Sequence, residues 1–244
     1  MATQPPIRVL SPDAMKFRSL HSWDLTPKEA VGLQRQLAGR VQAGPSLKRF
    51  ELVAGTDVSY HGPSRMMYAG VVIYSLGRRS VVERSGATMP ERFPYVPGLL
   101  SFRELPALLE AFSGIRRRPD VVLADGQGWA HPRRFGLACH LGLFLNLPTV
   151  GCAKSRLIGE HRLPGSRRGS SVQLRDGREV IGRVLRTRDG VKPVWVSVGH
   201  RIDLPSAVRV VLRSTAGYRL PEPVRLAHGY VNALRRATEG VSAG

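Results

Sequence analysis

The chain has 244 residues, 42% of them hydrophobic and 23% charged, which excludes a disordered protein and allows a sizeable buried core. It carries 37 Lys and Arg against 18 Asp and Glu, a formal net charge of +19. Such an excess favours a polyanionic partner, with nucleic acid the first candidate and a generically basic soluble protein the alternative from charge alone.

Nothing in the sequence points to a membrane. The first residues have no basic stretch followed by an apolar one, so we expect no signal peptide. The longest apolar stretch, 137–153, is interrupted by polar residues and a proline, which favours a buried helix followed by a buried strand. Cys139 and Cys152 lack the spacing of a metal site, so we expect two free buried thiols and a cytoplasmic protein.

The first part of the chain is predicted to form an arm, a helix and a three-stranded meander. Residues 1–22 show no sustained hydrophobic period and are expected to be an irregular arm. Thr26 and Glu29 have the spacing of a capping box, which predicts a helix that ends near Gly44. Three strand-like runs follow, at 51–60, 66–76 and 80–88. The breaks between them are short enough for hairpins, so these strands should be antiparallel.

The remainder alternates helices with strands. The predicted elements are a helix at 101–112, a strand at 120–125, a helix at 134–146, strands at 149–153, 179–187 and 194–198, and helices at 205–215 and 222–236. Residues 160–178 should form a surface loop, and residues 237–244 should fray. This order predicts an α/β fold with a ribonuclease-H-like mixed β-sheet flanked by helices, in a single domain over 23–236.

Three acids are candidates for a metal site. Asp57 lies inside the first strand, Asp125 ends the fourth strand, and Glu104 lies near the start of the helix between them. If the two strands are neighbours, the carboxylates converge at one sheet edge, where oxygen ligands select Mg²⁺ or Mn²⁺. The alternative from spacing alone is a helix-capping Asp125, a surface Glu104 and a salt-bridged Asp57.

Two histidines lie near residues that suggest a catalytic or binding role. His131 lies in a glycine-rich loop shortly after Asp125, and His200 follows a strand and would join the acids from another side. A surface role for His131 and a structural role for His200 are the alternatives. The other histidines are expected to be structural: His21, His61, His140, His161 and His228.

Several blocks of the sequence resemble the endonuclease V family, the deoxyinosine 3′ endonucleases. The blocks are FPYVPGLLSFRE at 93–104, DGQGWAHPRR at 125–134, GCAK at 151–154, GHR at 199–201 and GYRLPEP at 217–223. The resemblance implies a Mg²⁺-dependent nuclease, with Mn²⁺ as a substitute metal, that recognises hypoxanthine, the product of adenine deamination. Such an enzyme hydrolyses the second phosphodiester bond 3′ to the lesion and thereby initiates DNA repair.

The same resemblance assigns catalytic roles by position. Asp57, Glu104 and Asp125 match the acids of the family's metal site, and His200 matches the histidine that assists them. Lys154 matches a phosphate contact.

Residues for lesion recognition are assigned in the same way. Tyr95 matches the aromatic wedge that fills the gap left by the displaced base. The positions that match the surroundings of the base are Gly98, Leu100, Gly126, His131, Gly136, Gly151 and Leu157.

Two other functions stay open from the sequence. An inosine-specific endoribonuclease would use the same acids, because the contact that separates RNA from DNA is made to a 2′-hydroxyl. A non-catalytic nucleic-acid-binding domain would be favoured by an incomplete acidic set. In each case we expect a monomer that binds nucleic acid and no membrane.

Overall fold

The computed structural model describes residues 15, 17 and 19–241. Most of the arm predicted at 1–22 therefore lies outside the described residues, as do residues 242–244. The elements, in chain order, are α1 (Pro27–Ala38), β1 (Leu52–His61), β2 (Met66–Ser75), β3 (Ser80–Pro90), α2 (Leu100–Ser113), β4 (Val121–Ala124), α3 (Leu137–Leu145), β5 (Thr149–Ala153), β6 (Ser171–Asp176), β7 (Glu179–Leu185), β8 (Val194–His200), α4 (Leu204–Arg213) and α5 (Glu222–Val241).

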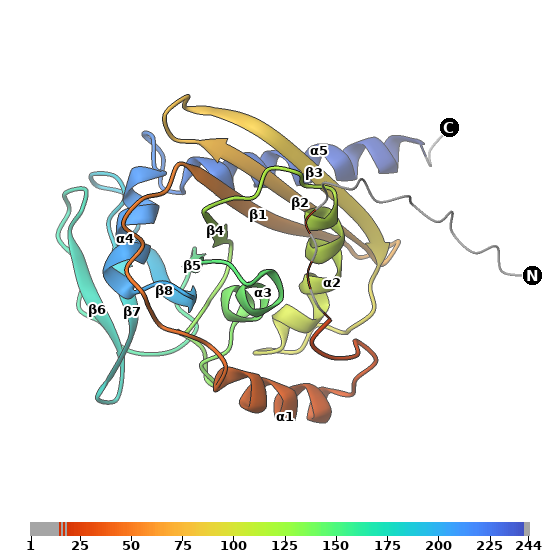
Figure 1. The fold of residues 1–244 in the computed structure, drawn as a ribbon, viewed down its shortest axis with the longest axis horizontal. Helices are drawn as coiled ribbons and strands as arrows, with labels where there is room; N and C mark the ends of the chain where they lie inside the picture. Colours follow the sequence, from red (N-terminus) through yellow and green to blue (C-terminus); the bar gives the residue numbers. More distant parts are fainter. Residues whose placement is uncertain (1–14, 16, 18, 242–244) are drawn as a thin grey trace, which may run out of the picture.

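These strands form one eight-stranded sheet in the order β3-β2-β1-β4-β5-β8-β7-β6 (Figure 1). β4 runs parallel to both β1 and β5, whereas the pairs β1–β2, β2–β3, β5–β8, β7–β8 and β6–β7 are antiparallel. The predicted mixed sheet flanked by helices is confirmed, and so is the βαβαβ order from β3 to β5 along the chain.

Helices cover both faces of the sheet, because successive strand residues point to opposite sides. Ala54 of β1 packs into the cluster formed with α2 and α3, and its neighbour Val53 packs into the cluster formed with α4 and α5. Figure 1 shows α2 and α3 on the near side and α5 behind the long strands β1 to β3. α1 lies apart from the sheet, below α3 in this view.

A line of glycines lets α5 approach the sheet closely. At Gly55 of β1, an added Cβ would overlap the backbone of Pro223 and Val224. At Gly70 of β2 a Cβ would lie 2.6 Å from a side-chain carbon of Val231, a contact that real Cβ atoms do not make. The spacing between α5 and β1 is therefore set by the helix backbone resting on the strand backbone.

Three predictions about element boundaries need correction. Helix α1 ends at Ala38, before the predicted end near Gly44. The loop predicted at 160–178 contains β6, an edge strand whose only buried residue is Leu174, so its polar sequence hides the strand period. Helix α5 continues to Val241, past the predicted domain end at 236 and into the predicted tail.

Cys139 and Cys152 are buried and free, as expected. No helix among the described residues has the length and the apolar run that crossing a membrane requires.

Candidate active site

The three predicted acids converge on one cavity. β1 and β4 are parallel neighbours with Thr56 opposite Ala124, so the next residue in each chain segment, Asp57 and Asp125, comes to the same edge of the sheet. Glu104 reaches this edge from the first turns of α2. All three residues line a cavity of about 260 Å³.

Crowding and burial oppose the charges of these acids. Asp57 is 9% exposed, and burial together with repulsion from Asp125 raises its pKa to about 6, against the opposing effect of a hydrogen bond to His228. Burial and the charges of Asp57 and Asp125 raise the pKa of Glu104 to about 8. Carboxylates that repel one another in this way are stabilised by a cation placed between them.

Two basic side chains already contact the acids. Lys154 Nζ lies 2.5 Å from Asp125 Oδ2, and His228 Nδ1 lies 2.9 Å from Asp57 Oδ2. Within the described chain, no three His, Cys, Asp or Glu side chains already surround one point as metal ligands would. The residues nevertheless fit a divalent cation, because Mg²⁺ is commonly held by one or two carboxylates with waters and substrate phosphates completing its shell.

A second cavity, of about 360 Å³, adjoins the acids. Asp125, Leu137 and Lys154 line both cavities. Of the residues predicted for lesion recognition, those that line the second cavity are Tyr95, Gly98, Leu100, Gly126, His131, Gly136 and Leu157. Tyr95 and Leu157 are exposed at 64% and 47%, which makes them available to a bound nucleic acid. We call this second cavity the base cavity.

Gly151 is not among the residues that line the base cavity. It lies in the buried strand β5, and a Cβ at this position would overlap the backbone of the 126–128 loop. The prediction that Gly151 surrounds the base is therefore not met directly, because Gly151 lies behind the cavity wall. Gly151 lets the loop that carries Gly126 rest directly on the sheet.

His131 is held in one tautomer by its neighbours. Its Nε2 lies 3.0 Å from the Gly98 carbonyl oxygen, which only accepts, and its Nδ1 lies 3.2 Å from the Arg133 backbone N–H, which only donates. Burial and the charge of Arg133 lower the pKa of His131 to about 4. His131 is therefore a neutral imidazole that donates to Gly98 in the wall of the base cavity.

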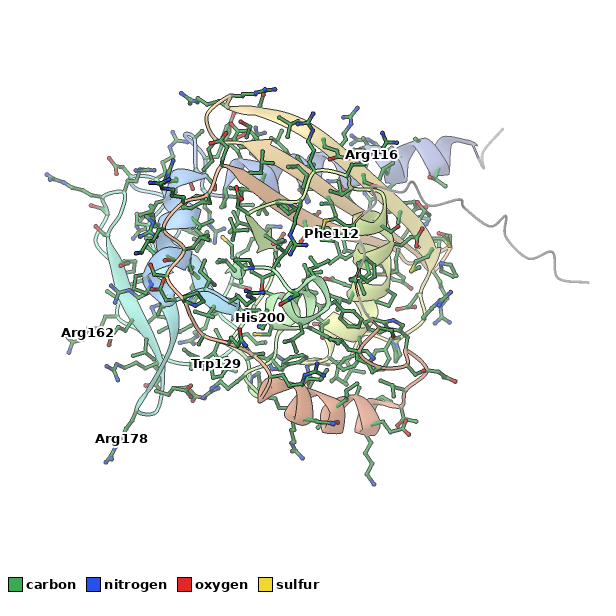
Figure 2. The ribbon with its side chains drawn as sticks, in the orientation of Figure 1. Phe112, Arg116, Trp129, Arg162, Arg178 and His200 are labelled. Carbon is green, nitrogen blue, oxygen red and sulfur yellow. The ribbon has the colours of Figure 1, made fainter. Side chains whose placement is uncertain are left out.

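The structure does not bring His200 to the acids. Its partner across the sheet is Thr149, at the start of β5, whereas Asp125 and Lys154 follow the ends of β4 and β5. β8 runs antiparallel to β5, so its end lies at the opposite edge of the sheet. His200 is 4% exposed in the interior (Figure 2), where its Nδ1 accepts from the Gln42 backbone N–H.

The histidine at the acids is His228, which was predicted to be structural. It lies on α5, and its side chain is 53% exposed. Its Nε2 lies 3.0 Å from the side-chain nitrogen of Asn232, one helical turn further on. With Asp57 accepting at Nδ1 and Asn232 donating to Nε2, both imidazole nitrogens have partners, so Nε2 can accept a proton only when the Asn232 amide turns away.

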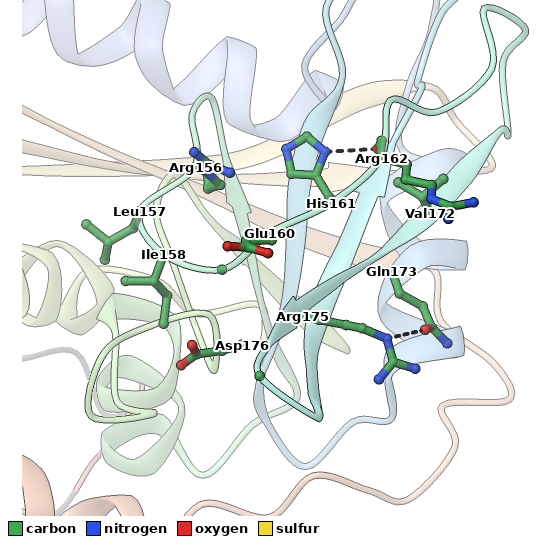
Figure 3. Close-up of a pocket in the computed structure, with 12 residues that line it drawn as sticks. Arg156, Leu157, Ile158, Glu160, His161, Arg162, Val172, Gln173, Arg175 and Asp176 are labelled. Atoms are coloured by element: carbon green, nitrogen blue, oxygen red, sulfur yellow. Dashed lines mark hydrogen bonds between the residues drawn. The ribbon is translucent and has the colours of Figure 1, made fainter.

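A larger cavity, of about 1010 Å³, lies elsewhere, between the 156–162 loop and β6 (Figure 3). Its wall holds two acids, Glu160 and Asp176, and Asp176 is paired with Arg134 outside the cavity. Arg175 and Gln173 bond to each other along β6. This cavity lacks the converging carboxylates of the smaller one, so its size does not make it the catalytic site.

The sheet order, with Asp125 following the end of β4 and Asp57 beside it within β1, defines a ribonuclease-H-like nuclease. The model of the endonuclease V family matches residues 35–229. The chain belongs to the endonuclease V family, the deoxyinosine 3′ endonucleases of DNA repair.

Individual relatives cover most of the chain. An endonuclease V of Dehalococcoides mccartyi is 51% identical over 214 residues, which are 88% of this chain and 96% of the relative. The crystal structure of endonuclease V from Streptomyces avermitilis has a TM-score of 0.85 at 42% identity, covering 89% of this chain and 96% of that one. Endonuclease V of Ciona intestinalis, solved in complex with a DNA containing an inosine followed by a ribo-adenosine, has a TM-score of 0.75 at 25% identity and covers 86% and 98%.

Proposed function

We propose that this enzyme binds a strand containing hypoxanthine, lodges the base in the base cavity and hydrolyses the second phosphodiester bond on its 3′ side. The observation that carries the proposal is the junction of the two cavities at Asp125 and Lys154. A base held in one cavity leaves its strand passing the acids of the other. The complex of the Ciona relative with inosine-containing DNA supports the same class of substrate.

Asp57, Glu104 and Asp125 would hold Mg²⁺, or Mn²⁺ in its place, at the acidic cavity. The bound metal supplies Lewis-acid stabilisation of the charge that develops on the scissile phosphate. Lys154, which contacts Asp125 at the junction of the two cavities, would contact a phosphate oxygen of the bound strand. Once the Asn232 amide turns away from Nε2, His228 would take a proton from the attacking water there, while Asp57 holds the proton on Nδ1.

Recognition of hypoxanthine is supported by the start of helix α2. The amides of Leu100 and Ser101 have no acceptor within the helix, and the preceding residue, Leu99, supplies no side-chain cap. Both residues line the base cavity. Their N–H groups would donate to the carbonyl oxygen at position 6 of hypoxanthine, where adenine carries an amino donor. Tyr95 would fill the gap in the stack that the extruded base leaves.

The experiment uses end-labelled 30-mers that carry one inosine or one adenosine, in matched DNA and RNA versions. We expect the wild type with Mg²⁺ to cut inosine-containing DNA at the second bond 3′ of the inosine and to leave the adenosine strand intact. Asp57→Ala and Asp125→Ala should abolish cutting while the melting temperature and strand binding persist. A preferred cut in the RNA strand would establish the endoribonuclease instead, and equal cutting of inosine and adenosine strands would overturn lesion recognition.

The domain over 23–236 supplies every residue of this scheme, and we propose that it acts as a monomer, since both cavities are lined by one chain. The two free thiols fit the reducing cytoplasm.

A further inference from the structure

The carbonyl oxygen of Gly98 receives three side-chain donors. Gln34 Nε2 lies 3.0 Å away, His131 Nε2 lies 3.0 Å away and Arg133 Nη2 lies 2.8 Å away. A carbonyl oxygen has two lone pairs, so three donors use up its capacity to accept. Gly98 has a φ of +79°, a conformation that glycine adopts without strain, and it is one of the residues that line the base cavity.

Gln34 is the donor that comes from a separate element. It lies on α1 and is 1% exposed. Its amide nitrogen donates to the carbonyls of Gly98 and Phe135, both at 3.0 Å, and its oxygen accepts from Arg133 Nε at 2.5 Å. Because the two carbonyls only accept and the guanidinium only donates, the amide has one orientation that satisfies all three partners.

The helix that carries Gln34 is anchored on both sides of this contact. Ala30 packs in the cluster that contains Phe93 and Leu99, at the two ends of the segment that carries Tyr95. One turn beyond Gln34, Leu37 packs with Phe135 and Cys139. α1 thus packs against both the 93–99 segment and the 131–136 loop. Gln34 is the residue of α1 that makes hydrogen bonds to both.

We propose that Gln34 is a positioning and specificity-determining residue for lesion recognition, a role that rests on the proposed binding of hypoxanthine in the base cavity. By holding the Gly98 carbonyl, Gln34 fixes the peptide that joins Gly98 to Leu99. The N–H of that peptide is bonded to the Val96 carbonyl at 2.9 Å, so the peptide is held at both ends. The cavity wall is therefore shaped before the base arrives, which spares the cost of ordering it on binding.

The test compares Gln34→Met with Gln36→Met. Both glutamines lie on α1, but Gln36 is exposed, so it controls for the substitution and for helix propensity. Fluorescence anisotropy in EDTA measures the affinity for a duplex with one inosine and for the same duplex with adenosine. Hydrogen–deuterium exchange of residues 95–101 measures the order of the cavity wall without any substrate. Gln34→Glu, which keeps the shape but cannot donate when ionised, serves as a second variant if Gln34→Met folds poorly.

We expect Gln34→Met to weaken binding of the inosine duplex about tenfold and to change binding of the adenosine duplex by less than about twofold, with faster exchange at 95–101. Gln36→Met should match the wild type in every measurement. Unchanged inosine preference, or an equal loss for both duplexes, would overturn the specificity role. Unchanged exchange would overturn the positioning role. A wild type that shows no inosine preference would instead overturn the proposed function, which keeps the two failures distinct.

Discussion

The imidazole of His228 lies 2.9 Å from the carboxylate of Asp57, although the two residues are 171 positions apart in the chain. The contact joins the last helix to the first strand. It gives the acidic cavity a group that can accept a proton when Asn232 releases Nε2, while the carboxylate stabilises the resulting positive charge. The site therefore depends on how α5 packs on the sheet as much as on the acids themselves.

Replacement of His228 tests this assignment. His228→Ala should lower kcat by about 10²–10⁴-fold, the usual contribution of a positioned acid or base. Its side chain is half-exposed, so the melting temperature should stay close to that of the wild type. His200→Ala is the contrasting variant: it should lower the melting temperature because His200 is buried, and change kcat only slightly. Loss of activity in His200→Ala at full stability would reverse the two assignments.

The raised pKa of Glu104 predicts how stability depends on pH. Folding raises this pKa from 4.5 to about 8, so between these values the folded protein holds a proton that the unfolded chain releases. The contribution of the protonated Glu104 carboxyl to the free energy of unfolding is fully present below pH 4.5, and it is lost as the pH rises through 8. Without metal, the free energy of unfolding of Glu104→Gln should therefore be more than about 1 kcal/mol higher than that of the wild type at pH 8. This difference corresponds to about 2–4 °C in Tm.

Thermal melts in EDTA at pH 5 and pH 8 measure this difference, which should shrink at the lower pH. Added Mg²⁺ should stabilise the wild type more than Glu104→Gln, because the ion replaces the proton on the carboxylate. A Glu104→Gln variant that is less stable than the wild type at pH 8 would contradict the electrostatic account.

Tyr95 should separate lesion recognition from chemistry. The ring is exposed at the rim of the base cavity, between Pro94 and Pro97, which stiffen the segment. Stacking of a base on an aromatic ring is worth about 1–3 kcal/mol, so Tyr95→Ala should weaken binding of an inosine duplex about tenfold. Binding of undamaged duplex should barely change, and Tyr95→Phe should keep most of the function. An equal loss for both duplexes would make Tyr95 a general contact.

The glycines beneath α5 give a prediction about stability and activity together. Gly55→Ala places a methyl group against the backbone of Pro223, and it should cost about 1–3 kcal/mol and lower kcat by displacing His228. Gly229→Ala is the control on α5 itself, since a Cβ there meets nothing within 4 Å. That variant should gain up to about 1 kcal/mol from helix propensity. Thermal melts and single-turnover cleavage measure both effects.

Much of the fold and the acid triad could be predicted from the sequence, because those signals are local. The hydrophobic period marks the elements, and the cavity is marked by an acid inside one strand, Asp57, and an acid at the end of its neighbour, Asp125. β6 was missed because an edge strand with one buried residue, Leu174, has no such period.

The histidines could not be assigned in this way. His200 follows a strand, as a ligand would, but the direction of β8 places it at the wrong edge, and strand direction is a property of the whole sheet. His228 sits on an amphipathic helix with no neighbouring motif of its own, and only the packing of α5 on β1 brings it to Asp57. Gln34 was hidden for the same reason, since its partners lie in two other segments.

The glycine line under α5 has a practical consequence for engineering. Where side chains separate a helix from a sheet, repacking them can shift the helix by fractions of an ångström and tune a site. Here the main chains of Pro223 and Gly55 meet directly, so no choice of side chain at this contact can bring the helix closer. Thermostable variants of this nuclease are better sought on the face of β2 and β3 that packs against α2, at positions that do not line the acidic cavity, where volume can be exchanged without moving His228.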